Sequence, residues 1–313
     1  MPLPLHLAIA ILAAGMASAG TVVITSLPDE DHPLQPLGAL DGTALSGASE
    51  IRVGAFPGMD ADELLDAAAS GGFAGLSAAF VSFGDSYGMG DGALGENGSF
   101  EISVRQKLEA SGSPLAGEEI SLLIKQGNEF LVARFPSQLF EADPETGLEP
   151  LKALHLADSK LIVGNRYGST KLVTSPPPTK GSFNTWIEGF QGITDPELKL
   201  RDADADGDGR SNFLEYATGG DPASPTDPAP CQIFADGDSL WVKFCREAGV
   251  GTIDYTVKFS ASLSASWSTM DGDFEPDPDP PVAGDLNWMR LRVSPTADPH
   301  RFFRLEVKPD EAP

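Results

Sequence analysis

Residues 204–215 of this chain of 313 residues form the stretch Asp204-Ala205-Asp206-Gly207-Asp208-Gly209-Arg210-Ser211-Asn212-Phe213-Leu214-Glu215. Carboxylates alternate at its start, and Glu215 adds another at its end. Gly209 follows the third aspartate, where a chain that curls back needs a residue free of Cβ strain. Carboxylates held this close repel one another, so the stretch predicts a loop closed around a cation.

The ligand types indicate which cation the loop would hold. Ca²⁺ takes about six to eight oxygen ligands in a flexible arrangement, whereas Mg²⁺ requires a tighter octahedron. Carboxylate, amide and backbone oxygens are all available in this loop. We therefore expect a calcium site with the ligands Asp204, Asp206, Asp208, Arg210 (through its backbone carbonyl), Asn212 (directly or through water) and Glu215 (with both oxygens).

This D-x-D-x-D-G pattern with glutamate at the twelfth place resembles EF-hand calcium loops, as found in dockerins and thrombospondin type 3 repeats. Ser211 stands at the eighth place, where paired EF-hands usually carry an aliphatic residue, and the sequence holds no second such motif. The resemblance therefore implies one unpaired structural site rather than a cooperative sensor. A solvated acidic turn without an ion is the alternative.

Helix signals flank the loop. Thr194–Glu197 has a capping aspartate and a first-turn proline, and Ser211–Ala217 predicts an exiting helix that ends at Gly219. Ser182 is a further candidate cap. Its helix would place three apolar residues on one face for core packing: Trp186, Ile187 and Phe190.

The region upstream of these helices has the pattern of short strands. Apolar runs separated by Gly, Asn, Asp or Pro clusters favour an antiparallel sandwich. One short helix, with an acidic start and a Gly71-Gly72 end, is expected at 60–69. The candidate strands are 21–25, 51–56, 78–83, 100–105, 120–125 and 130–135, the last two forming a hairpin.

Two proline-rich breaks divide the chain. The prolines after Ser175 favour an extended, semi-rigid spacer, and a second break precedes Cys231. Downstream strands are expected at 254–259, 286–293 and 302–307, with an exposed acidic loop at 271–281. The predicted fold is mainly β, with two antiparallel β-sandwich-like domains joined by a short helical calcium-loop segment. The expected parts are a signal peptide (1–19), an N-terminal β domain (20–175), a linker (176–181), the helical segment (182–222), a second linker (223–230) and a C-terminal β domain (231–313).

Cys231 and Cys245, the two cysteines, flank a predicted hairpin. If they face each other, the turn centre falls at Asp238 with a three-residue loop, and both thiols share one side. In an oxidising compartment this predicts a disulfide between Cys231 and Cys245. Two free, buried thiols are the alternative.

The N-terminal residues indicate export. A short apolar run from Leu3 to Ala14, followed by Ala17-Ser18-Ala19, is typical of a cleaved secretory signal. No later apolar run is long enough to span a membrane. A formal net charge of −25 argues against nucleic acid as a partner. We expect a secreted, extracellular or cell-envelope protein.

No catalytic motif for nucleophilic, metallopeptidase or nucleotide chemistry occurs, and the four histidines are far apart in sequence. The acidic loop around His32 is expected to be exposed rather than metal-binding. We expect a non-enzymatic protein in which calcium stabilises an inter-domain junction. The alternatives are a carbohydrate- or surface-binding adhesion module in the N-terminal domain, with Tyr87 and Tyr167 as free aromatics, and a hydrolase. Partners are unknown, with a cell-surface glycan or an extracellular protein as the possible classes.

Over residues 182–309, the order of parts resembles the C-terminal portion of uncharacterised secreted bacterial proteins. In these proteins a thrombospondin type 3-like loop precedes a small terminal β module. The parts that carry this resemblance are the aromatic helix, the calcium loop, Gly220-Asp221-Pro222, the strand pair near Trp267 and 301–307. The resemblance implies extracellular or envelope placement and assigns no activity.

Overall fold

The structure is a computed structural model that describes residues 20–90, 96–109, 112–144, 150–167, 170–226, 231–237, 239–247, 249–270, 272, 274–278, 286–293 and 302–309. The expected signal peptide, 1–19, lies outside these residues. The chain is mainly β, with several antiparallel sheets and three α-helices in the described part. None of the described helices combines the length and the apolar character that a membrane-spanning helix needs.

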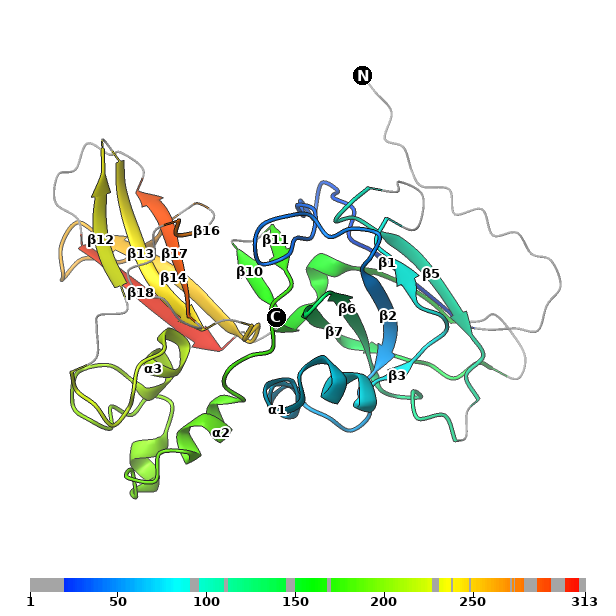
Figure 1. The fold of residues 1–313 in the computed structure, drawn as a ribbon, viewed down its shortest axis with the longest axis horizontal. Coiled ribbons are helices and arrows are strands. Elements are labelled where there is room, and N and C mark those ends of the chain that lie inside the picture. The colour runs from blue at the N-terminus through cyan, green and yellow to red at the C-terminus, as the bar shows by residue number, and fades with distance from the viewer. Residues whose placement is uncertain are drawn as a thin grey trace.

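The first β region holds two main sheets (Figure 1). One has the order β5-β1-β8 and the other β3-β2-β6-β7-β9, with β4 paired to β2 and a separate pair β10-β11. β1 and β8 run parallel, so this region is not purely antiparallel. The strands are β1 (Gly20–Thr25), β2 (Glu50–Ala55), β3 (Val81–Ser82), β4 (Tyr87–Gly88), β5 (Glu101–Gln106), β6 (Glu119–Gln126), β7 (Glu129–Leu139), β8 (Leu151–His155), β9 (Lys160–Val163), β10 (Asn165–Tyr167) and β11 (Lys171–Val173), with a 3-10 turn at Leu156–Asp158.

α1 (Ala61–Ala79) covers the second of these sheets. Asp60 and Glu63 form a capping box at its start, as the acidic sequence there predicts. The expected end at Gly71-Gly72 and the expected strand at 78–83 are both wrong in part. Gly72, with φ of +55°, kinks the helix, which then continues to Ala79 because Leu76 is buried in the core. The strand is shorter than expected and comprises only Val81–Ser82.

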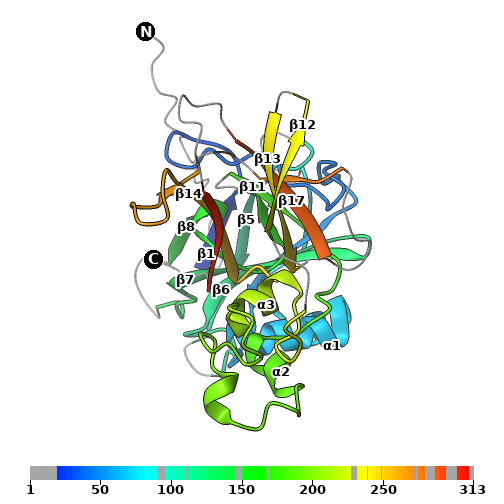
Figure 2. The ribbon, with the colours of Figure 1, turned by 90° about the vertical axis from the view of Figure 1, so that its left-hand side faces the viewer.

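Three short helical elements follow. They are α2 (Phe183–Glu188), capped by Ser182, a 3-10 turn (Pro196–Lys199), capped by Asp195, and α3 (Asn212–Thr218), capped by Ser211 and ended by left-handed Gly219. The sequence predicted the cap at Ser182, a capped start at 194–197 and the end at Gly219, whereas Ser211, expected as the first helical residue, is the cap. Together they lie below the junction of the two β regions (Figures 1 and 2).

The second β region also has two sheets, with the orders β12-β13-β17-β16 and β15-β14-β18. The expected acidic loop at 271–281, of which part lies outside the described residues, contains a short strand, and Asp277 in it is buried against Lys243. The strands are β12 (Cys231–Asp236), β13 (Ser239–Glu247), β14 (Ile253–Ser260), β15 (Ser268–Thr269), β16 (Glu275–Pro276), β17 (Leu286–Val293) and β18 (Phe302–Pro309).

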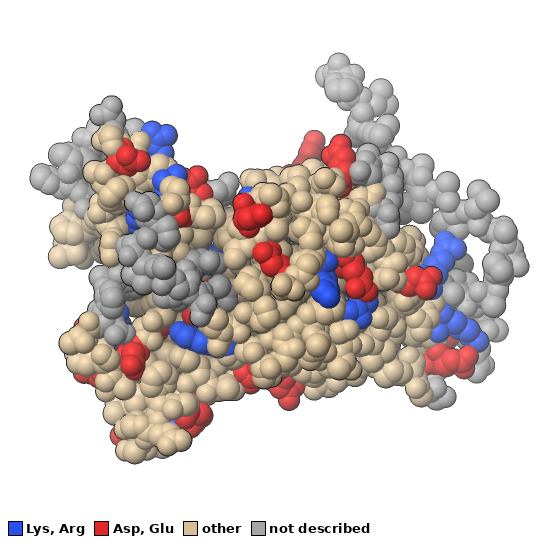
Figure 3. Space-filling model, viewed as in Figure 1, with Lys and Arg blue, Asp and Glu red and all other residues tan. Residues whose placement is uncertain are grey.

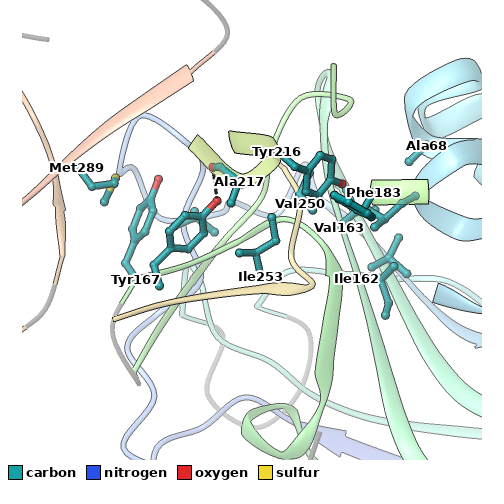
Figure 4. Close-up of a cluster of buried hydrophobic side chains, with 14 of the residues drawn as sticks. Ala68, Ile162, Val163, Tyr167, Phe183, Tyr216, Ala217, Val250, Ile253 and Met289 are labelled. Carbon is teal, nitrogen blue, oxygen red and sulfur yellow. Dashed lines mark hydrogen bonds between the residues drawn. The ribbon is translucent and has the colours of Figure 1, made fainter. Parts of the chain in front are cut away.

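Two hydrophobic clusters organise these elements. One lies between the two sheets of the first β region. The other begins under α1, passes through α2 and α3, and continues between the sheets of the second β region. In Figure 4 this second cluster extends from Ala68 of α1, past Tyr216 and Ala217, to Met289 of β17.

The proline-rich segment expected as a spacer is packed against both β regions. Ser175 is buried, and its backbone exchanges hydrogen bonds with Phe130 at 2.9 and 3.0 Å. Farther along, Thr179 Oγ1 donates to Glu247 Oε1 at 2.7 Å, and Lys180 Nζ lies 3.2 Å from Glu247 Oε2. The two β regions therefore contact each other through this segment.

The predicted disulfide is wrong, because both cysteines are free. Asp236 pairs with Ser239, so the hairpin turns over two residues rather than three, and Cys231 lies opposite Phe244. Successive side chains of a strand point to opposite faces, so this shift of one residue places Cys245 on the other face of the sheet.

Alkylation tests this register. The protein is unfolded in denaturant without reductant, and iodoacetamide is then added. Both cysteines should gain a carbamidomethyl group, so the mass should equal that of a sample reduced beforehand. In the native state labelling should be slow, because burial raises the pKa of Cys231 to about 11 and that of Cys245 to about 12. A mass that requires prior reduction for labelling would contradict the register.

A buried hydroxyl links α3 to the second β region. Tyr255 Oη donates to the carbonyl of Ala217 at 2.7 Å and accepts the Glu247 N–H at 3.2 Å. Tyr255→Phe leaves both buried groups unpaired, so the free energy of unfolding should fall by about 2 kcal/mol in urea titrations. Tyr87→Phe is the control, since its exposed hydroxyl bonds to Ser103 O and its loss should change little. Equal effects of the two variants would contradict this role of Tyr255.

Candidate metal centre

The loop at 204–215 begins and ends on neighbouring backbone. The Asn212 N–H donates to the Ala203 carbonyl at 2.7 Å, and the Phe213 N–H donates to Arg201 O at 3.0 Å. These bonds hold the two ends of the loop together, and the chain continues from the loop directly into α3.

Inside the loop, the aspartates accept hydrogen bonds from the backbone. Asp204 accepts from Gly207 N with Oδ1 and from Gly209 N with Oδ2, both at 2.8 Å, so the chain curls around its carboxylate. Asp206 Oδ1 accepts from Asp208 N at 3.1 Å. Gly209 has φ of +91°, as the predicted sharp turn requires.

The structure brings the first three expected ligands together. Oxygen atoms of Asp204, Asp206 and Asp208 lie within 4.8 Å of one another. Asp206 Oδ2 is buried and accepts no hydrogen bond from any described residue. Burying an oxygen without a partner lowers the stability of the fold unless a cation or a water binds to it.

Asn212 supplies a second unsatisfied oxygen. The side chain is fully buried, and its Nδ2 donates to Leu198 O at 2.8 Å and to Leu200 O at 2.9 Å. These bonds fix which end of the amide is nitrogen. Oδ1 then has no hydrogen-bond donor within the described part of the chain. An amide oxygen of this kind suits a hard cation, directly or through water.

Glu215, the fourth carboxylate, is outside the group of three. It is fully buried in α3, and Gly220 packs against it so closely that a Cβ at Gly220 would lie 2.9 Å from Glu215 Cβ. Its Oε1 is 3.9 Å from Nη2 of Arg210. A buried carboxylate requires nearby positive charge, and Arg210 is the nearest that the ion pairs of the described residues show.

The side chain of Arg210 lies between two expected ligands. Its Nε donates to Asp208 Oδ2 at 2.6 Å, and Nη2 lies 2.5 Å from the same oxygen. The hydrogen bond from Arg210 holds the pKa of Asp208 below its usual value. The sequence indicated only the backbone carbonyl of Arg210 as a ligand. The guanidinium is thus an internal counter-charge that an entering cation would displace.

A second polar cluster forms around two histidines that are distant in sequence. His32 and His155 stack with ring centroids 4.1 Å apart, and His32 bridges Asp29 (3.0 Å) and Asp158 (3.1 Å). His155 accepts from Ala157 N and contacts Leu27 O, so both of its ring nitrogens are engaged. The pairing of β8 with β1 brings them together, which no local sequence pattern indicates.

Two other expectations bear on alternative functions. Tyr167, expected to be a free aromatic, is buried, while Tyr87 is half-buried with its hydroxyl on Ser103 O. The face seen in Figure 3 carries scattered acidic and basic side chains without a continuous basic patch. Of the two aromatic residues expected to be free for carbohydrate binding, only Tyr87 is therefore partly exposed.

No protein-family model, no curated protein and no solved structure matches the chain. The geometry of the acidic loop is accordingly the guide to function.

The histidine cluster predicts a pH-dependent contribution to stability. The hydrogen bond to Asp29 raises the pKa of His32 above its ordinary 6.5. A folded pKa above the unfolded one stabilises the fold fully below about pH 6.5, and this contribution is lost as the pH rises through the folded pKa. The unfolding free energy of the wild type should exceed that of His32→Gln at pH 5.5 and approach it at pH 8.5. Glu30→Gln, in the same loop, should show no such trend. A pH-independent difference for His32→Gln would contradict the role of His32.

Proposed function

We propose that this chain is a secreted, non-enzymatic calcium-binding protein, in which an ion in the loop Asp204–Glu215 stabilises the junction between two β regions. The ligands are Asp204, Asp206, Asp208, the Arg210 carbonyl, Asn212 and Glu215. The loop is of the EF-hand-like type, similar to dockerin and thrombospondin type 3 loops, and the two β regions act as sandwich-like domains.

The main support for the proposal is the position of α3, which begins within the loop and packs between the two β regions. Glu215, at the end of the loop, is followed directly by Tyr216 and Ala217, which belong to the cluster that joins α1 to the second β region. Tyr216 packs on Phe183 and Trp186 of α2, and its hydroxyl donates to Gly181 O at 2.7 Å. An ion that fixes Glu215 therefore restrains the helix on which both regions pack.

The size of the expected effect is modest. Single extracellular calcium sites typically have Kd values of roughly 10⁻⁴ to 10⁻³ M. At ten times Kd, an ion that binds only the folded chain adds about 1.4 kcal/mol to stability. This is enough to hold a junction in place, and it suits a structural site rather than a signalling one.

Calcium titration of Glu215→Gln tests the proposal. In calorimetry the wild type should bind one Ca²⁺, and the variant should bind about tenfold more weakly or worse, because it loses a charged bidentate ligand. The melting temperature of the wild type should fall on chelation, and that of the variant should not. The control is Glu188→Gln, whose exposed carboxylate pairs with Lys199 nearby and should leave calcium affinity unchanged.

Arg210→Gln separates calcium binding from a self-neutralised acidic turn. In the proposal it removes a competing cation and keeps the backbone ligand, so calcium affinity should rise by about fivefold, equivalent to about 1 kcal/mol. If the turn is only an ion-free structure held by Arg210, the variant should lose stability equally with calcium and with chelator. The latter result, or the absence of calcium-dependent heat in the wild type, would contradict the proposal.

A further inference from the structure

Arg246 of β13 is a buried cation without an acidic partner. Only 3% of the residue is exposed, and none of the ion pairs of the described residues includes it; its charged or ionisable neighbours are tyrosines. Its Nη1 donates to Arg166 O at 3.1 Å, and Nη2 donates to Asn165 Oδ1. Nε has no acceptor among the described residues. A charge removed from water without a counter-charge is costly, and arginine cannot release its proton to avoid this cost.

The aromatic rings around Arg246 do not supply the missing charge. Its guanidinium lies 5.0 Å from the centroid of Tyr167 and 5.6 Å from that of Tyr255, which gives cation–π attraction. Burial raises the pKa of both tyrosines above 10, so both stay neutral. The rings therefore leave the positive charge of Arg246 without a counter-charge, although the whole chain carries −25.

A second buried donor without an acceptor lies beside Arg246. Asn165 is fully buried, and its Oδ1 accepts hydrogen bonds from Arg246 and from Gly249 N. These contacts fix the amide orientation, and Nδ2 then has no acceptor in the described residues. Arg246 Nε and Asn165 Nδ2 are therefore neighbouring buried donors without an acceptor in the described residues, and an unsatisfied donor on a buried guanidinium suits the oxygens of an anion.

Space for an anion is present beside Arg246, whereas Asn165 is not among the residues that line it. A cavity of about 130 Å³ is lined by Arg166, Arg246, Ile253, Asp254, Tyr255 and Phe274. One water takes roughly 30 Å³ in the liquid, so a small polyatomic ion fits. Asp254, the acidic residue of this lining, is exposed, so solvent screens its charge, whereas Arg246 is screened little.

We propose that this cavity binds a small tetrahedral oxyanion, either free phosphate or sulfate or the phosphoryl or sulfuryl end of a larger molecule. Arg246 provides the buried positive charge, and Arg166, whose Nη2 also donates to Ser159 O at 3.4 Å, provides a second guanidinium at the cavity, while Tyr255 and Phe274 form apolar parts of its wall. The guanidinium fork matches the oxygens of such an anion. The site lies between β10 of the first β region and β13 and β14 of the second, away from the residues of the acidic loop.

Calorimetry with inorganic phosphate, sulfate and acetate at constant ionic strength and with chelator present tests this proposal independently of calcium. Saturable binding of phosphate or sulfate is expected, with a melting temperature that rises with the anion and not with chloride. Arg166→Gln should weaken this binding about tenfold, and Arg246→Lys should weaken it further. Arg290→Gln is the control, because Arg290 pairs with Glu275 on the same sheet and should leave binding unchanged.

The test has clear negative outcomes. No saturable binding of phosphate or sulfate, or binding of acetate alone, overturns the proposal. Binding that Arg166→Gln leaves unchanged also overturns it, even if Arg246→Lys fails to fold. To distinguish a free ion from the end of a larger molecule, phenyl phosphate is compared with phosphate: tighter binding supports a phosphoryl end, and exclusion supports the free ion.

Discussion

One turn of α3 contacts three parts of the junction between the two β regions. In it, Glu215 faces the acidic loop, Tyr216 packs on the aromatic residues of α2, and the Ala217 carbonyl accepts the hydroxyl of Tyr255. All three residues are buried, so none can shift without disturbing its neighbours. The end of the loop and this part of the junction therefore lie on the same helix.

Electrostatics set the second constraint on the loop and α3. The acidic loop concentrates carboxylates in a chain whose net charge is already −25. Backbone N–H groups and the Arg210 side chain offset part of this charge, yet Asp206 Oδ2 and Asn212 Oδ1 stay unsatisfied within the described structure. A divalent cation would satisfy these oxygens and release the arginine. Elsewhere in the junction, Arg246 presents the opposite problem, a buried positive charge that suits an anion.

Local sequence signals predicted local structure well. The cap Ser182, the acidic helix start at Asp60, the helix end at Gly219, the turn at Gly209 and the hairpin between β6 and β7 all depend on residues a few positions apart, and all were confirmed. Their physical causes, side-chain capping bonds and permitted backbone angles, are readable from short segments.

Features set by register or by distant pairing could not be predicted in this way. A turn shorter by one residue moved Cys245 to the opposite face from Cys231, because side chains alternate along a strand. The stacking of His32 on His155 depends on the parallel pairing of β1 with β8. The burial of Arg246 follows from packing between regions about 80 residues apart in sequence. The helix kinked at Gly72 continued because of tertiary contacts of Leu76, which override the local stop signal.

Hydrogen–deuterium exchange with calcium and with chelator tests the central claim most directly. If calcium restrains α3 and the junction, the ion should slow amide exchange in α3, in α2 and in β14, and leave β1 and β5 unchanged. Slower exchange confined to residues 204–211, or no difference between the two conditions, would show that the loop does not hold the junction together.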